Sequence, residues 1–235
     1  ASRAKTEFMN RMSHDVRTPI NGIMGMLDII RKNRQDEAKV DDCLDKINLS
    51  ASHLLALVND VLDMNKLESG KETIESVSFE LTHLMDDVAS LVNAQIAEMG
   101  ITHRTHRGEL THTRLIGSPL RLRQIMLNLF SNAIRYNKPG GMIDTYAGEV
   151  SCDGTRVVYE FRIMDSGIGM SSEFIEKELF HPFTQEKSGA RTQYKGTALG
   201  MSIVKELIEK MQGTIEVTSQ QGVGTTYVFR LPFYI

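Results

Sequence analysis

The chain has 235 residues, of which 41% are hydrophobic and 24% charged, and its formal net charge is -3. This length and composition can bury a sizeable core, divided between two domains, and the slightly acidic charge gives no electrostatic reason to expect nucleic acid as a partner. No apolar run approaches the roughly 20 residues that span a bilayer, and no signal peptide opens the sequence.

The two cysteines and the first residues bear on where the protein resides. Cys43 and Cys152 lie far apart in unlike sequence contexts, which favours a reducing compartment over a disulfide scaffold. The sequence begins abruptly inside a helical pattern, so we expect a fragment of something longer. We therefore expect a soluble, cytosolic-type piece of a longer protein.

The N-terminal segment, up to about residue 32, predicts one amphipathic helix. Its apolar residues follow the spacing of a buried helical face, and they are Phe8, Met12, Val16, Ile23, Leu27 and Ile30. At about 100° per residue, His14 falls on the opposite, polar side of this helix. Asp15 follows directly, and Thr18 lies one turn on. Pro19 cannot donate to the carbonyl of Asp15, so the helix should be weakened or kinked there. The alternative is a solvated histidine on an ordinary helix.

A second helix is predicted from about Val40 to Glu68, after a polar loop. Its apolar positions alternate spacings of four and three over several heptads. Two long helices with a short connection form an antiparallel hairpin. We expect this hairpin, residues 1–70, to pair with a second copy as a four-helix bundle; the alternative is that the second domain, residues 71–235, covers its apolar surface.

The second domain mixes strands and helices. Strands are predicted at 75–80, 102–106, 113–116, 142–150, 157–164, 214–219 and 225–232, and helices at 81–99, 120–135, 174–179 and 197–211. This order favours an α+β sandwich with helices on one face of a mixed sheet. The loop-rich stretch at about 170–196 is long enough to suggest a lid.

Three polar features of this domain point to a nucleotide. Asn128, Asn132 and Arg135 share one helix face, where amide oxygens and a cation suit magnesium and phosphates; a solvated helix face is the alternative. Asp165-Ser-Gly167-Ile-Gly169 follows an apolar strand, so backbone can approach a ligand there, although a plain tight turn looks similar. Lys195-Gly196-Thr197-Ala-Leu-Gly200 opens a helix whose N-terminal amides can bind phosphate. Neither a dinucleotide-binding fingerprint nor a P-loop is present.

These motifs stand in the order found in sensor histidine kinases. They are His14-Asp15 to Pro19, the Asn128/Asn132 helix, Asp165-x-Gly167-x-Gly169, Phe180 with Phe183, and Gly196-Thr-x-x-Gly200. Over essentially its whole length the sequence resembles the dimerisation and phosphoacceptor domain plus the GHKL-type ATP-binding domain of two-component systems, and it looks most like the hybrid kinases. The resemblance implies an α+β fold: a helical hairpin that forms a dimeric four-helix bundle, followed by an α/β sandwich.

The resemblance also implies roles. His14 would attack the γ-phosphate of ATP, Asp15 would orient the imidazole, and Thr18 would position water when a phosphorylated receiver is dephosphorylated. The partners implied are a second copy of the chain and the receiver domain of a response regulator, whose aspartate would take the phosphoryl group from His14. The resemblance also implies the cytoplasmic portion of a larger, membrane-anchored sensor, with membrane attachment made by segments absent from this fragment.

In the second domain, the resemblance implies an ATP site with Mg²⁺. Asn132 would ligate Mg²⁺ with Asn128 beside it, Arg135 would lie near the phosphates, Tyr136 would pack by the adenine, and Asp165 would accept from its exocyclic amine. Gly167, Gly169, Gly196 and Gly200 would shape the pocket and the hinges of the lid. Lys195 and Thr197 belong to the same implied cofactor site, where Lys195 could supply a positive charge near the phosphates.

Three positions depart from the pattern of many relatives. Ala198 stands where many have Gly, Thr184-Gln185 where many have a basic residue, and Ser118 where an acidic residue usually precedes the asparagine helix. We expect Ser118 to cap that helix. The first two departures motivate an alternative, a nucleotide-binding dimer that acts mainly as a phosphatase or scaffold. A gyrase- or chaperone-like ATPase is a further alternative, disfavoured by the histidine hairpin.

The remaining histidines are interpreted as structural. His53 is expected on the surface of the helical bundle. His103, His106 and His112 lack a cysteine or carboxylate partner at metal-ligand spacing, so we expect solvated side chains there.

Overall fold

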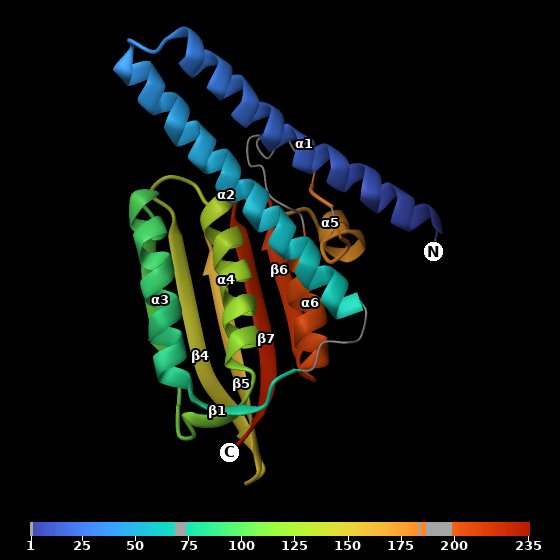
Figure 1. The fold of residues 1–235 in the computed structure, drawn as a ribbon. Coiled ribbons are helices and arrows are strands. Elements are labelled where there is room, and N and C mark those ends of the chain that lie inside the picture. Colours follow the sequence, from blue (N-terminus) through green and yellow to red (C-terminus); the bar gives the residue numbers. More distant parts are fainter. Residues whose placement is uncertain (1, 69–73, 183, 187–198) are drawn as a thin grey trace.

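The computed structural model describes residues 2–68, 74–182, 184–186 and 199–235. The chain begins with a helical hairpin of α1 (Ser2–Lys32) and α2 (Glu37–Glu68), which pack side by side along their length (Figure 1). The predicted hairpin is therefore confirmed. α1 stays helical through Pro19, whose side chain is buried, so the missing backbone donor does not end the helix. None of the helices in the described part of the chain is long and apolar enough to cross a membrane.

Several element boundaries differ from the predictions, and a carboxylate explains two of them. α2 begins at Glu37 rather than Val40 because Asp36 caps it: the backbone N–H of Lys39 donates to Asp36 Oδ1 at 3.2 Å. The first strand begins at Val77 rather than Glu75. Glu75 Oε1 instead accepts from the backbone N–H of Leu120 at 3.2 Å, so this residue serves the start of a later helix.

The rest of the chain forms one mixed sheet with helices. Its strands are β1 (Val77–Glu80), β2 (Thr102–Arg107), β3 (Arg114–Gly117), β4 (Met142–Cys152), β5 (Arg156–Asp165), β6 (Thr214–Gln220) and β7 (Gly224–Tyr234). The order is β1-β3-β7-β5-β4-β2, with β6 also paired to β7. Only β2 and β4 pair in parallel; the other pairs are antiparallel. The mixed sheet expected from the sequence is confirmed.

The larger helices of this domain lie on one face of the sheet (Figure 1). They are α3 (Leu81–Glu98), α4 (Pro119–Arg135) and α6 (Gly200–Lys210); a short α5 (Ser172–Lys177) follows β5. Apolar side chains from these three helices and from the strands form one buried core. Phe161 of β5 and Phe229 of β7 stack inside it, with ring centroids 4.9 Å apart. Burial of one stripe of each helix against one sheet face gives the α+β sandwich.

α2 also joins the hairpin to the sheet domain. It packs against α6 (Figure 1), and Leu57 is buried while Val61 packs on the domain core. Other large apolar side chains of the hairpin stay exposed, namely Ile20, Met24, Leu27, Leu44, Leu49, Leu55, Val58 and Leu62. The sheet domain therefore covers only part of the apolar surface of the hairpin.

Candidate functional site

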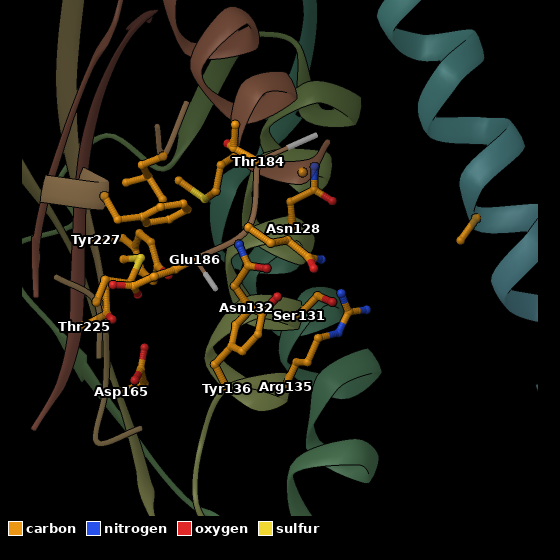
Figure 2. A pocket seen from close by; sticks show the side chains of 17 residues that line it. Asn128, Ser131, Asn132, Arg135, Tyr136, Asp165, Thr184, Glu186, Thr225 and Tyr227 are labelled. Atoms are coloured by element: carbon orange, nitrogen blue, oxygen red, sulfur yellow. The ribbon is translucent and has the colours of Figure 1, made fainter. Parts of the chain in front are cut away.

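A cavity of about 210 Å³ opens between α4, α6, the turn after β5, and β7. Figure 2 shows its polar side chains: Asn128, Asn132 and Arg135 project from α4, while Asp165 and Thr225 lie across from them. Ala56 of α2 also lines the cavity, so the helical hairpin borders it. The structure therefore brings together the α4 residues and Asp165, which the sequence analysis selected separately.

The amphipathic character of α4 explains why its polar residues face the cavity. One stripe of the helix is buried in the core, comprising Leu122, Ile125, Met126, Leu129, Phe130, Ala133 and Ile134. Asn128, Asn132 and Arg135 occupy the remaining face and are half-buried. Ser118 caps the helix as predicted, since its Oγ accepts from the backbone N–H of Arg121 at 3.3 Å. All three side chains line the cavity.

Asn128 has an unusual environment for a helix residue. Its Nδ2 atom is buried and has no hydrogen-bond partner among the described residues. An unsatisfied buried donor costs about 1–3 kcal/mol. Native proteins rarely tolerate such a cost without a reason. Such a donor in the wall of a cavity is suited to a ligand whose oxygen atoms accept hydrogen bonds.

Asp165 lies at the end of β5 and is buried. Its Oδ1 accepts from the backbone N–H of Gly167 at 2.9 Å, which holds the carboxylate in place. The next residue of the turn, Ile168, donates its N–H to the carbonyl of Tyr136 at 3.0 Å and accepts from Gly222 N–H at 2.8 Å. The turn is thus tied both to the end of α4 and to the β6–β7 connection.

Two glycines make this turn possible. A Cβ at Gly167 would lie 2.2 Å from the carbonyl oxygen of Tyr136, and a Cβ at Gly169 would lie 1.8 Å from that of Gln220. Gly169 also has a φ of +62°, a conformation that favours glycine. These glycines therefore let backbone segments approach one another around Asp165. The sequence analysis predicted that both glycines shape the pocket. In the structure, each allows a neighbouring backbone segment to pack closely against it.

Several lining residues were missed by the sequence analysis. Thr225 pairs with Asp165 in the β5–β7 register and is buried, and its Oγ1 lies 2.9 Å from Ser219 Oγ. Apolar walls come from Met170, Phe174, Leu179 and Met201. Strand alternation could have indicated that Thr225 faces the cavity, because it lies opposite Asp165 in the β5–β7 register.

The other predicted residues are placed only in part. Gly200 lines the cavity at the start of α6, and a Cβ there would meet its nearest atom, Asn128 Cγ, at 3.9 Å. Thr18 is half-buried in α1, which also contains His14 and Asp15; the side chains of those two lie outside the described part of the structure. Lys195, Gly196 and Thr197 lie outside the described residues as well, as do Phe183 and much of the predicted lid.

The first part of that lid is described and is tied to the domain. Ser171 Oγ caps α5 by accepting from Phe174 N–H at 3.3 Å. Glu186 Oε1 accepts from the backbone N–H of Ser171 at 3.0 Å and from Gln221 Nε2 at 3.1 Å. Thr184 donates its hydroxyl to the carbonyl of Glu178. These contacts hold the beginning of the segment against the β6–β7 connection, beside the cavity.

Comparison with protein families identifies two segments of the chain. Residues 4–70 match the model of the His Kinase A (phospho-acceptor) domain. Residues 117–235 match that of the histidine kinase-, DNA gyrase B- and HSP90-like ATPase. The second segment contains the whole α4 face, Asp165 and every residue that lines the cavity except Ala56. Both matches agree with the resemblance seen in the sequence.

Individual relatives are kinases that are much longer than this chain. Hybrid signal transduction histidine kinase B of Dictyostelium discoideum is 36% identical over 99% of this chain and 12% of its own length. The signal transduction histidine-protein kinase BarA of Escherichia coli (strain K12) is 36% identical over 98% of this chain and 25% of its own length. The chain thus spans about a quarter or less of these curated relatives.

A solved structure has the same fold over nearly the whole chain. The crystal structure of full-length ShkA in complex with AMPPNP matches with a TM-score of 0.68 and 28% identity, over 97% of this chain and 46% of that one. The order of the motifs, the two matched family models and this shared fold agree. The chain therefore belongs to the sensor histidine kinases, within the family of histidine kinase-, DNA gyrase B- and HSP90-like ATPases.

Proposed function

We propose that this chain is the core of an ATP-dependent protein histidine kinase, which phosphorylates its own His14 and passes the phosphoryl group to an aspartate of a receiver domain. The observation that carries the proposal is the cavity beside α4. It combines a buried donor on Asn128 that has no partner among the described residues, further polar side chains on the same face, and a buried carboxylate, Asp165, opposite them. This arrangement of hydrogen-bond donors and a carboxylate acceptor suits a nucleotide, with phosphates along α4 and the base near Asp165.

The base end of the cavity is proposed to select adenine. A carboxylate accepts strongly from an amine N–H, and the Gly167 N–H holds the Asp165 carboxylate at the cavity wall. Tyr136 lies at the C-terminal cap of α4 and lines the same cavity, where its ring could pack beside a base. Apolar walls such as Met170 and Met201 would exclude water from the base.

The phosphate end is proposed to hold Mg²⁺ through Asn132, with Asn128 beside it. Amide oxygens are suitable ligands for this hard cation, which also keeps several waters. When bound, Mg²⁺ would offset the charge of the phosphates during transfer. The Nδ2 of Asn128, which has no hydrogen-bond partner among the described residues, would donate to a phosphate oxygen or a bound water. Arg135, one turn further along α4, would add a positive charge near the phosphates.

The chemical step is a phosphoryl transfer to nitrogen. An unprotonated ring nitrogen of His14 attacks the γ-phosphorus, a P–N bond forms, and the bond from phosphorus to the oxygen of the leaving ADP breaks. Asp15 would accept the proton on the other ring nitrogen by a hydrogen bond and keep the attacking nitrogen unprotonated. The catalytic contribution of the chain is mainly positioning, because such transfers need alignment and charge neutralisation.

The domain boundaries and partners belong to the same proposal. Residues 1–70 would form the dimerisation and phosphoacceptor domain, and residues 71–235 the catalytic domain, with a lid at about 170–196. The apolar side chains exposed on the helical hairpin support pairing with a second copy as a four-helix bundle. Thr18, four residues after His14, would help position water when the phosphorylated receiver is dephosphorylated.

The test is labelling with radioactive ATP and Mg²⁺. We expect acid-labile, base-stable label on the wild-type chain and none on His14→Gln. Asn132→Ala should lose both the label and nucleotide binding. His53→Gln is the matched control, since it removes another histidine of the hairpin and should be labelled normally. Acid-stable label, or label that survives in His14→Gln, contradicts the proposal.

The same preparations distinguish the alternatives. Nucleotide binding without labelling of His14, together with intact dephosphorylation of a phosphorylated receiver, would favour the phosphatase or scaffold. Sustained ATP hydrolysis without any phosphoprotein would favour a gyrase- or chaperone-like ATPase.

A further inference from the structure

The connection between β4 and β5 lies at the end of the sheet opposite α2 and α5 (Figure 1). A second group of reactive side chains is found next to this connection. His112 of the β2–β3 connection, Glu149 of β4 and Cys152 at the end of β4 each present one ligand atom, and these atoms all lie within 4.8 Å of one another. We propose that His112, Glu149 and Cys152 form a binding site for a zinc-class divalent metal ion, separate from the nucleotide cavity.

An irregularity of β4 places Glu149 and Cys152 on the same face. Residues three apart in a regular strand point to opposite faces. Here the β4–β5 register shifts between Glu149 and Ser151, so the strand contains one extra residue. Glu149 pairs with Tyr159, and Cys152 pairs with Val157. Those two partners are two apart on β5 and face the same side, so the bulge brings the carboxylate and the thiol together.

His112 is held over Glu149 from two directions. Its backbone N–H donates to Glu149 Oε2 at 3.3 Å, and its carbonyl accepts from the hydroxyl of buried Tyr159 at 2.7 Å. Its Nδ1 lies 3.1 Å from both carboxylate oxygens of Glu149. The connection is also tied to β4 where Glu149 N–H donates to the carbonyl of Glu109 at 2.9 Å. Two of the three ligands are thus in place before a metal binds.

The ligand types indicate the class of metal. Imidazole, carboxylate and thiolate are the three protein ligands that Zn²⁺ accepts, and a site with three of them leaves a fourth position for water. Ligand atoms about 3.1–4.8 Å apart need only a modest contraction to surround one ion. Calcium and magnesium prefer oxygen ligands and are disfavoured by the thiol and the imidazole.

An ordinary histidine–carboxylate pair elsewhere in the domain shows what distinguishes this group. His106 Nε2 lies 3.1 Å from Asp144 Oδ1, but no cysteine joins them within the described residues, and the His106 side chain is 61% exposed against 35% for His112. Cys152 is exposed and accepts from Gly154 N–H at 3.4 Å. An ion could therefore reach the thiol from solvent while the other two ligands stay fixed. Sequence spacing gave no hint, because Glu149 lies 37 residues after His112.

The test uses the whole chain, stripped with a chelator and kept reduced. Titration with Co²⁺ should give a thiolate-to-cobalt charge-transfer absorption that saturates at one ion per chain and is displaced by Zn²⁺. Cys152→Ser should lose this absorption. Loss of a residue that only hydrogen-bonds to a metal ligand already weakens metal binding by roughly 10–100-fold. His112→Gln removes a ligand itself, so it should weaken Zn²⁺ binding by at least that factor. Cys43→Ser and His106→Gln are the matched controls, and both should bind like the wild type.

Folding is checked in parallel through thermal unfolding and the binding of ADP. Cys152 is exposed, so its replacement by Ser should change neither. If His112→Gln perturbs the fold, Cys152→Ser alone decides the matter. Absence of the charge-transfer absorption in the wild type, or an equal absorption in Cys152→Ser, overturns the proposal.

Discussion

The close packing around Gly167 leads to a specific prediction about the nucleotide cavity. In Gly167→Ala the new Cβ would lie 2.2 Å from the Tyr136 carbonyl oxygen and 2.8 Å from Asp165 Oδ1. Neither atom belongs to a flexible chain end: one is backbone at the cap of α4, and the other belongs to a buried carboxylate. The turn must therefore move away from α4 by about 1 Å.

This movement has an energetic cost that can be estimated. Overpacking of this kind typically costs about 1–3 kcal/mol. Displacement also weakens the hydrogen bonds from Gly167 N–H to Asp165 and from Ile168 N–H to Tyr136, at about 1 kcal/mol each. We expect the free energy of unfolding to fall by about 3 kcal/mol, which lowers the melting temperature by about 6–12 °C in a chain of this size. Because Asp165 moves with the turn, binding of ADP should weaken as well.

Gly200→Ala is the matched control for stability. This glycine lines the same cavity, but its Cβ would meet its nearest neighbour at an ordinary contact distance of 3.9 Å. Its melting temperature should stay at or above that of the wild type, because alanine favours a helix. Calorimetry of both variants, with and without ADP, provides the measurement. A Gly167→Ala variant as stable as Gly200→Ala would refute the packing argument.

Three further outcomes are expected. Asn128→Ala removes a buried donor that has no partner in the described part of the chain. Nucleotide-free stability should therefore hold or rise by up to about 1 kcal/mol, while ADP affinity falls at least about tenfold. Thermal shift with and without ADP separates the two effects, and a large nucleotide-free loss of stability contradicts the argument. Ser118→Ala removes the cap of α4 and should cost about 1 kcal/mol in urea unfolding; an unchanged midpoint would show that the cap is dispensable. Burial lowers the pKa of His103 below its usual 6.5, although the negative charge of Asp144 opposes the shift. Below pH 6.5 the unfolded chain therefore binds more protons than the folded chain, and the contribution of this residue to stability falls as the pH drops. His103→Gln should flatten this pH dependence, measured by urea unfolding at several pH values.

Local patterns in the sequence predicted much of the fold. The position of α4 could be predicted because its apolar stripe, the capping Ser118 and the turn residues Pro139-Gly140-Gly141 that follow it all lie within one segment. The Asp165 turn could be predicted because a carboxylate and two glycines follow an apolar strand directly. Boundaries such as the start of α2 were less accurate, since a single side-chain cap shifts them by a turn.

The sequence by itself determined the order of the elements, the mixed α+β class and the residues that the kinase motifs share. Only the tertiary structure decided which distant side chains meet. Thr225 reaches Asp165 through the β5–β7 register, and Cys152 reaches His112 because one extra residue in β4 reverses which face the end of the strand presents. Register and bulges arise from strand pairing across the whole sheet. No window of sequence around His112 contains that information.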